Sequence, residues 1–181
     1  MVIIMIKNNK KIVIINTIAI FLSMFLFSFI YRWFPNFLTA SLFPVNESLF
    51  EHLKLMYTSF VLISLLTLLV LKFKKIKVNN YFLAILISVI VNIVLFFLIY
   101  LPIYNRFGEG LIYTMIIYAI TLIISEYIFY LIINKHHLET INSISIIILP
   151  IIWCLLVYFT FNPIHTDFFF DPISETYGIP D

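Results

Sequence analysis

One short stretch, residues 46–54, gathers acidic, basic and imidazole side chains between two long apolar runs. It reads NESLFEHLK, and its ionisable members are Glu47, Glu51, His52 and Lys54. A carboxylate beside an imidazole supplies the groups that general acid–base catalysis needs, and an ammonium can hold an anionic part of a substrate. We therefore take Glu51, His52 and Lys54 as candidate catalytic residues.

The same residues also have a purely structural interpretation. Ser48-Leu49-Phe50-Glu51 matches a capping box, in which Ser48 bonds exposed backbone N–H groups and Glu51 reaches back to the start of the helix. Glu51 and Lys54 can also pair at i,i+3. Neither role accounts for His52. Nor does either role explain why Lys54 lies about 8 Å into an apolar helix, a depth at which ionisable groups are costly and usually functional.

A second polar stretch is the tail, residues 162–181. His165 and Asp167 are two residues apart, so they point the same way if the tail is extended. If the tail folds over the start of the second apolar run, two imidazoles and several carboxylates meet. That set suits Zn²⁺ or a related divalent ion, and a tail resting in the membrane interface is the alternative. The candidate metal ligands are Glu47, Glu51, His52, His165 and Asp167.

Five apolar runs must position these groups. The chain has 181 residues, of which 63% are hydrophobic and 11% charged, with a mean hydropathy of +1.10. Each run is about 20 residues long, the length that a helix needs to cross about 30 Å of hydrocarbon. We expect an all-α integral membrane protein with a single membrane domain, residues 1–181. The predicted transmembrane helices are residues 12–33, 49–71, 80–102, 111–133 and 142–161.

The basic residues predict the orientation of these spans. With five spans, eight lysines fall on one side of the membrane, and Arg32 and Arg106 fall on the other. Cytoplasmic connections are enriched in Lys and Arg, so we expect the N-terminus inside and the C-terminus outside. The start of the second span and the tail then share the outer face. The eight lysines are Lys7, Lys10, Lys11, Lys72, Lys74, Lys75, Lys77 and Lys135.

Several polar residues lie within the predicted spans. Ser88 and Asn92, at i,i+4, suit hydrogen bonds between helices. Glu126 suits either a protonated carboxyl bonded between helices or a group of a proton relay. Cys154 is the one cysteine of the chain, and its apolar neighbours predict a buried, inert thiol.

Segments 46–54 and 168–178, NESLFEHLK and FFFDPISETYG, resemble the hallmark stretches of an uncharacterised family. Its members are small multispanning membrane proteins, mainly from low-GC Gram-positive bacteria, described as a domain of unknown function. The resemblance extends to the length and span arrangement of the whole chain. It implies a multi-pass protein of the bacterial inner (cell) membrane with no assigned reaction, and it transfers no catalytic residue.

Three classes of function follow from this pattern. An enzyme acting on a lipid or envelope substrate would use the outer polar site, with a metal ion or a headgroup bound there. An ion-coupled transporter component would use Glu51, Lys54 and Glu126 as a polar path, with oligomerisation supplying the missing half. A non-catalytic scaffold or envelope-stress partner would need only the lipid bilayer. The net charge of +2 is too small and dispersed for a nucleic-acid partner.

Overall fold

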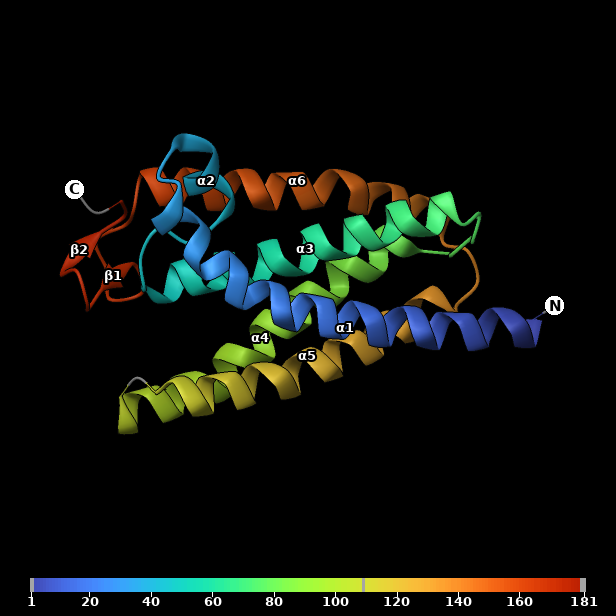
Figure 1. Cartoon of the computed structure of the whole chain (residues 1–181), viewed down its shortest axis with the longest axis horizontal. Coiled ribbons are helices and arrows are strands. Elements are labelled where there is room, and N and C mark those ends of the chain that lie inside the picture. Colours follow the sequence, from blue (N-terminus) through green and yellow to red (C-terminus); the bar gives the residue numbers. More distant parts are fainter. Residues whose placement is uncertain (1, 109, 180–181) are drawn as a thin grey trace.

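The computed structural model describes residues 2–108 and 110–179, with side chains from Lys10 onward, and shows an elongated helical bundle (Figure 1). The long helices are α1 (Val2–Trp33), α3 (Leu49–Phe73), α4 (Tyr81–Phe107), α5 (Leu111–Ile133) and α6 (Glu139–Phe161). A short helix, α2 (Phe37–Leu42), joins α1 to α3, and the tail forms a hairpin of β1 (Phe170–Asp171) and β2 (Thr176–Tyr177).

Within these described residues, five helices are long and apolar enough to cross a membrane, which confirms the prediction of five long apolar helices. Several helix ends differ from the predicted ones: α1 begins at Val2, α3 ends at Phe73, and the other differences lie in α4 and α6. Helix α4 continues past Pro102 to Phe107, and α6 begins at Glu139, so Pro150 lies inside it. A proline removes one backbone hydrogen bond from its helix. A packed bundle tolerates this loss, because neighbouring helices and local adjustments of the turn can satisfy the freed carbonyl group.

Hydropathy did not predict α2, because its six residues, four of them apolar, are too few to stand out beside the first span. A capping box starts this helix. Asn36 Oδ1 accepts a hydrogen bond from Thr39 N at 3.1 Å, and Thr39 Oγ1 accepts one from Asn36 N at 3.1 Å. The ring of Phe37 stacks on Phe161 at 5.1 Å, so α2 docks against the end of α6.

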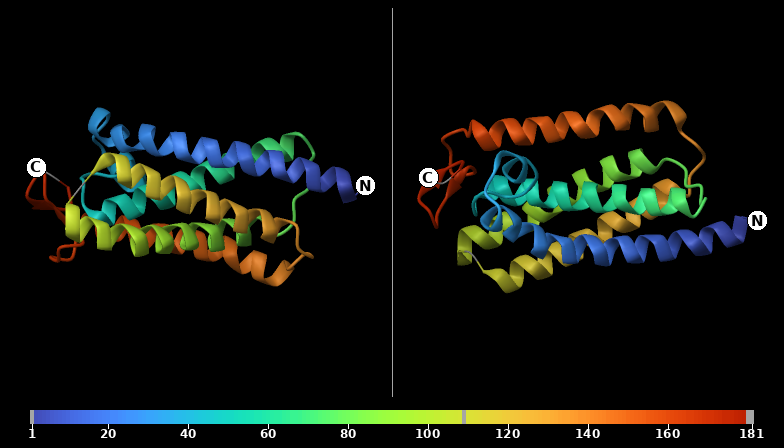
Figure 2. Two further views of the ribbon diagram at one scale, coloured as in Figure 1. Left: turned by 90° about the horizontal axis from the view of Figure 1, so that it is seen from below. Right: turned by 45° about the horizontal axis from the view of Figure 1, so that its top comes forward.

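The long helices run side by side, and the start of α1 and the tail hairpin lie at opposite ends of the bundle (Figures 1 and 2). Helix α1 packs against α3 and α5, α4 packs against α5, and α6 packs against α4 and α2. We call the end that carries α2 and the hairpin the tail end. The opposite end, which holds the start of α1 and the α3–α4 and α5–α6 connections, is the N-terminal end (Figure 1).

The outer faces of the long helices carry large apolar side chains. Leu98 on α4 is 67% exposed and Ile147 on α6 is 61% exposed, and such residues recur on every long helix. Cys154 is exposed as well, so the prediction of a buried thiol is wrong. Apolar neighbours in sequence cannot distinguish a core-facing position from a surface position when both faces of a helix are apolar.

Candidate functional site

Glu51 and Lys54 form a buried ion pair near the tail end of α3. Lys54 Nζ lies 2.6 Å from Glu51 Oε2, and the two side chains are 0% and 1% exposed. The ammonium also donates to the Ala40 carbonyl at 2.9 Å and to Thr160 Oγ1 at 2.8 Å. An ammonium has three N–H donors, so each of them has an acceptor here.

The Glu51 carboxylate is equally well bonded. Its Oε1 accepts a hydrogen bond from Thr160 Oγ1 at 2.9 Å, and its Oε2 accepts one from Val45 N at 3.1 Å. Burying an ion costs several kcal/mol even after relaxation, and the pair recovers this only when its remaining positions are hydrogen-bonded. The bonds of Glu51 and Lys54 meet that condition and join α2, α3 and α6.

Lys54 also completes the C-terminus of α2. The last carbonyls of a helix lack partners within the helix and carry partial negative charge. The Ala40 carbonyl receives the ammonium of Lys54, and the Ser41 carbonyl accepts from Trp153 Nε1 at 3.2 Å. The depth of Lys54 in α3 is therefore explained by the short helix that docks beside it.

Only half of the predicted capping box at Ser48 is formed. Ser48 Oγ accepts a hydrogen bond from Glu51 N at 3.3 Å. The Glu51 side chain does not return to the Ser48 N–H, which instead donates to Asn46 Oδ1 at 2.9 Å. The reason is that the carboxylate of Glu51 is already occupied by Lys54, Thr160 and Val45.

His52 lies on a different side of α3. Its Nδ1 lies 2.9 Å from the Ser48 carbonyl, so Nδ1 carries a proton and donates it there. Its Nε2 lies 3.8 Å from Glu47 Oε2, and Glu47 also pairs with Arg32 in the last turn of α1. The candidate catalytic residues therefore do not face one site, because Glu51 and Lys54 are enclosed and His52 is partly exposed.

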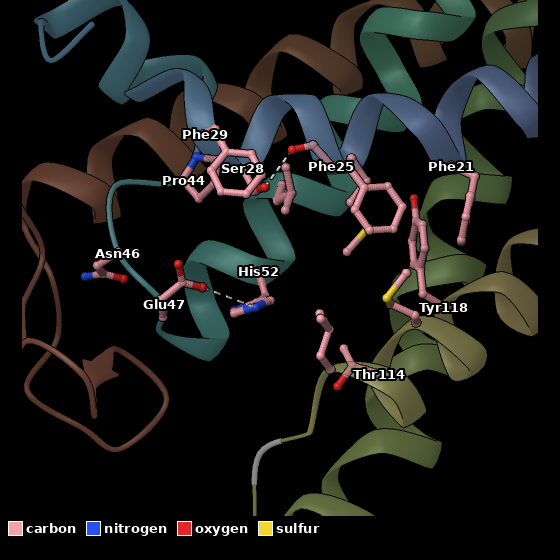
Figure 3. A pocket seen from close by; sticks show the side chains of 14 residues that line it. Phe21, Phe25, Ser28, Phe29, Pro44, Asn46, Glu47, His52, Thr114 and Tyr118 are labelled. Atoms are coloured by element: carbon pink, nitrogen blue, oxygen red, sulfur yellow. Dashed lines mark hydrogen bonds and ion pairs between the residues drawn. The ribbon is translucent and has the colours of Figure 1, made fainter. Parts of the chain in front are cut away.

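Asn46, Glu47 and His52 stand at one end of a cavity of about 230 Å³, bordered by α1, α3 and α5 (Figure 3). We call it the tail-end cavity. Its polar end lies beside the loop that precedes α3, while Phe21 and Tyr118 lie at the far end (Figure 3). Apolar side chains make up most of the remaining wall: Met24, Phe25, Phe29, Pro44, Leu55, Leu111 and Met115.

The tail lies over the same end of the bundle. Phe50 N, in the first turn of α3, donates to the Phe168 carbonyl at 2.9 Å, and Asn46 Nδ2 donates to the Gly178 carbonyl at 2.7 Å. The ring of Phe169 stacks on Phe50 at 4.5 Å. The tail thus satisfies one of the unpaired N–H groups at the start of α3 and covers its apolar end.

Asp171 organises the turn of the hairpin. Its Oδ1 accepts from Ile173 N at 2.9 Å and its Oδ2 from Ser174 Oγ at 2.5 Å, and the backbone N–H of Glu47 also bonds to it. Burial alone would raise the pKa of Asp171, but these hydrogen bonds together hold the pKa below its ordinary value. The ionised form of Asp171 therefore ties the hairpin to the segment before α3.

The structure brings only some of the candidate metal ligands together. Glu47, His52 and Asp167 border one small cavity of about 20 Å³ beneath the tail. Glu51 turns away to Lys54, and His165 stacks on Tyr177 at 4.5 Å. In the described ranges, no group of three or more His, Cys, Asp or Glu side chains is placed to hold a metal ion. The zinc site stays a prediction.

A second buried network surrounds Glu126 and includes a residue that the sequence reasoning missed, Asn16. Asn16 Nδ2 donates to Glu126 Oε1 at 2.9 Å and to Ser64 Oγ at 3.2 Å, and Asn16 Oδ1 accepts from Thr67 Oγ1 at 2.9 Å. The sequence could have indicated Asn16, because a carboxamide within a predicted transmembrane helix is a strong candidate for hydrogen bonds between helices.

Other interior polar groups have no hydrogen-bond partner within the described part of the chain: the hydroxyls of Ser59, Ser88 and Tyr118 and the carboxamide of Asn92. The bonds between helices that we predicted for Ser88 and Asn92 are therefore not formed. Asn92 and Tyr118 lie near each other without a hydrogen bond of normal geometry. Buried polar groups of this kind are uncommon and call for an explanation such as water or a ligand.

Comparison with protein families gave one match. The model of DUF6512, described as a family of unknown function, matches residues 1–179. Comparisons with curated proteins and with solved structures gave no match. The matched region includes all six helices, the buried ion pair and the tail hairpin. The chain therefore belongs to the family of unknown function DUF6512.

Proposed function

We propose that this protein is a multi-pass membrane protein that binds one amphiphilic lipid by its headgroup in the tail-end cavity. The observation that carries the proposal is the division of the cavity into a polar end, with Asn46, Glu47 and His52, and a mostly apolar remainder. A lipid has the same division. The volume of about 230 Å³ suits a headgroup and the first part of a chain, since pockets for whole drug-sized ligands are about 300–1,000 Å³.

Membrane insertion is supported by the surface of the bundle. Soluble monomers rarely expose large contiguous apolar patches, whereas every long helix here exposes Leu, Ile or Phe side chains. The lysines of the α3–α4 and α5–α6 connections lie at the N-terminal end, and the acidic tail lies at the other. This distribution supports an N-terminus inside and a C-terminus outside. The family resemblance carries the proposed location in the bacterial cell membrane.

The charges around the polar end favour a particular headgroup. Glu47 is 30% exposed and can attract an amine, and Arg32, its partner, is 57% exposed and can attract a phosphate. His52 adds a second group that can accept or donate a hydrogen bond through Nε2. We therefore take the ligand as a phospholipid whose phosphodiester carries an amine.

Photoreactive phospholipids that differ only in headgroup test this proposal. The protein in nanodiscs should crosslink most strongly to an ethanolamine lipid, at peptides that contain Met24 or Met115, and less to a glycerol lipid. Glu47→Gln should reduce the preference for the amine, while Glu175→Gln, in the tail away from the cavity, should not. Crosslinks spread evenly around the helices, or a headgroup preference that survives Glu47→Gln, would show that the cavity is not a lipid site.

Cysteine labelling tests the orientation. The exposed Cys154 is first replaced by serine, and single cysteines are then placed at Lys75, in the α3–α4 connection, and at Ile173, in the hairpin. In intact cells an impermeant maleimide should label the second and not the first. Equal labelling of both from outside would contradict the orientation and remove the outer location of the cavity.

Ion-coupled transport is a second candidate, favoured by the unpartnered interior groups. Ser59, Ser88, Asn92 and Tyr118 come from α3, α4 and α5, and Tyr118 also borders the tail-end cavity. Such groups can line a path for an ion or for water. Proteoliposomes that contain Asn92→Leu should then lose a proton or cation flux that the wild type shows. A wild type without any flux would rule this candidate out.

A further inference from the structure

Another cavity, open to the outside, lies between α1 and α5, nearer the N-terminal end, with a volume of about 390 Å³. It shares no lining residue with the tail-end cavity. Most of its wall is apolar, and the polar exceptions include Lys10, Thr17 and Glu126. We call it the Glu126 cavity. It is large enough to hold several water molecules, each of which occupies about 30 Å³ in the liquid.

Glu126 is bonded through only one of its oxygens. The residue is 1% exposed, and its Oε1 accepts the hydrogen bond from Asn16 Nδ2. Its Oε2 is buried and has no hydrogen-bond partner among the described residues. The described chain also shows no ion pair to Glu126, and Lys10, the basic residue of the cavity wall, is exposed.

Glu51 provides a contrast within the same protein. It is buried to the same extent, yet both of its oxygens accept hydrogen bonds and one of them touches an ammonium. That environment stabilises a negative charge. A carboxylate at Glu126, with one neutral donor and an unpartnered oxygen, would pay the large cost of burying an isolated charge.

We infer that Glu126 is a proton-binding site, with the proton carried on Oε2 and exchanged through the Glu126 cavity. Binding is a simple protonation: the proton bonds to the carboxylate oxygen, cancels the charge and can donate to water in the cavity. The site goes beyond the lipid site proposed above, and it holds whether or not the protein transports anything.

Among the described groups around Glu126, none is better suited than Glu126 itself to exchange a proton near neutral pH. Tyrosines keep their proton there, because a phenol ordinarily titrates near pH 10. Lys10 favours the ionised form of Glu126, but its exposure weakens this effect, because charges on the surface are screened. The titratable groups that face Glu126 are Lys10 from α1, Tyr81 from α4, and Tyr118, Tyr127 and Tyr130 from α5. Helix α3 contributes the hydroxyls of Ser64 and Thr67, both through Asn16.

Infrared spectroscopy of the full-length protein in nanodiscs measures protonation directly. The wild type should show the C=O band of a protonated carboxyl at neutral pH, and the band should disappear reversibly in alkaline buffer. Glu126→Gln should lack the band and still fold, because the glutamine carbonyl can accept from Asn16. A band that is absent at every pH, or that persists unchanged at every pH, would overturn the inference.

Reaction with a hydrophobic carbodiimide tests whether Glu126 can be reached through the cavity. The acid proton adds to a nitrogen of the reagent, the carboxyl oxygen bonds its central carbon, and the adduct rearranges to an N-acylurea that retains every atom of both reactants. Mass spectrometry of the wild type should find the adduct at Glu126, less of it at higher pH, and none at the ion-paired Glu51. Ile123→Trp, which fills the cavity wall, should slow the reaction and leave the infrared band unchanged. Equal labelling of Glu51 and Glu126, or no slowing by Ile123→Trp, would refute exchange through the cavity.

Discussion

Replacement of Lys54 by methionine tests how far the buried ion pair holds the tail end together. The substitution keeps the length of the side chain but removes the ammonium, so Glu51 keeps a buried charge without its partner. The Ala40 carbonyl at the end of α2 also loses its donor. Removing one member of a buried ion pair typically costs about 3–5 kcal/mol. For a protein of this size, each kcal/mol lowers the melting temperature by about 2–4 °C, so we expect a drop of about 6–20 °C.

Fluorescence of Trp153 reports the loss, since its indole bonds to α2, and Trp33→Phe removes the other tryptophan. The double variant Glu51→Gln/Lys54→Met should be more stable than Lys54→Met alone, because the unpaired charge is gone. Lys72→Met, at an exposed position of the same helix, is the control and should melt as the wild type does. If Lys54→Met melts within about 2 °C of the wild type, or if the double variant shows no recovery, the ion pair does not stabilise this end.

Three further changes probe contacts at the tail end. Asp171→Asn should loosen the hairpin, because the ionised form of Asp171 stabilises the folded tail. The pKa of Asp171 is lowered in the folded protein, so this stabilisation is complete above the ordinary carboxyl pKa of about 3.9. It is lost as the pH falls through the folded pKa. Proteolysis of the wild-type tail should therefore quicken in acid, and proteolysis of the variant should depend little on pH; matching profiles would contradict this. Asn46→Ala removes the bond to Gly178 and should speed tail cleavage at neutral pH, whereas unchanged cleavage would mean that the aromatic contacts suffice. Tyr57→Phe loses the hydrogen bond to the Leu149 carbonyl and should cost about 1 kcal/mol in thermal unfolding; a variant as stable as the wild type would show that this bond adds nothing.

The helical fold could be predicted because length and hydropathy act locally. Each apolar run is long enough to span a bilayer, and the turns between runs are marked by polar residues. The i,i+3 pairing of Glu51 and Lys54 was predictable for the same reason, since both lie on one helix. Orientation and the lipid site depend on the surroundings of the protein and stay proposals.

The rest of the site depends on contacts that hydropathy does not encode. Thr160 lies 106 residues from Lys54 in the chain, and Ala40 contributes a backbone carbonyl, which any residue would supply. The Ser48 motif predicted a capping box, but Asn46 took the place of Glu51 because a stronger partner for the carboxylate lay on the same helix. Such competition between local and distant partners becomes visible only when the helices are packed.

The bond between Lys54 and Thr160 has a consequence for biosynthesis. Ribosomes add about 5–20 residues per second, so roughly 5–20 s separate the synthesis of the two partners across 106 residues. During that interval α3 is already made, and its carboxylate and ammonium lack the hydroxyl that α6 later supplies. The bonding of the ion pair is therefore complete only after the last helix has docked. A chain in which α6 fails to dock keeps an incompletely bonded ion pair at Glu51 and Lys54, which destabilises the tail end.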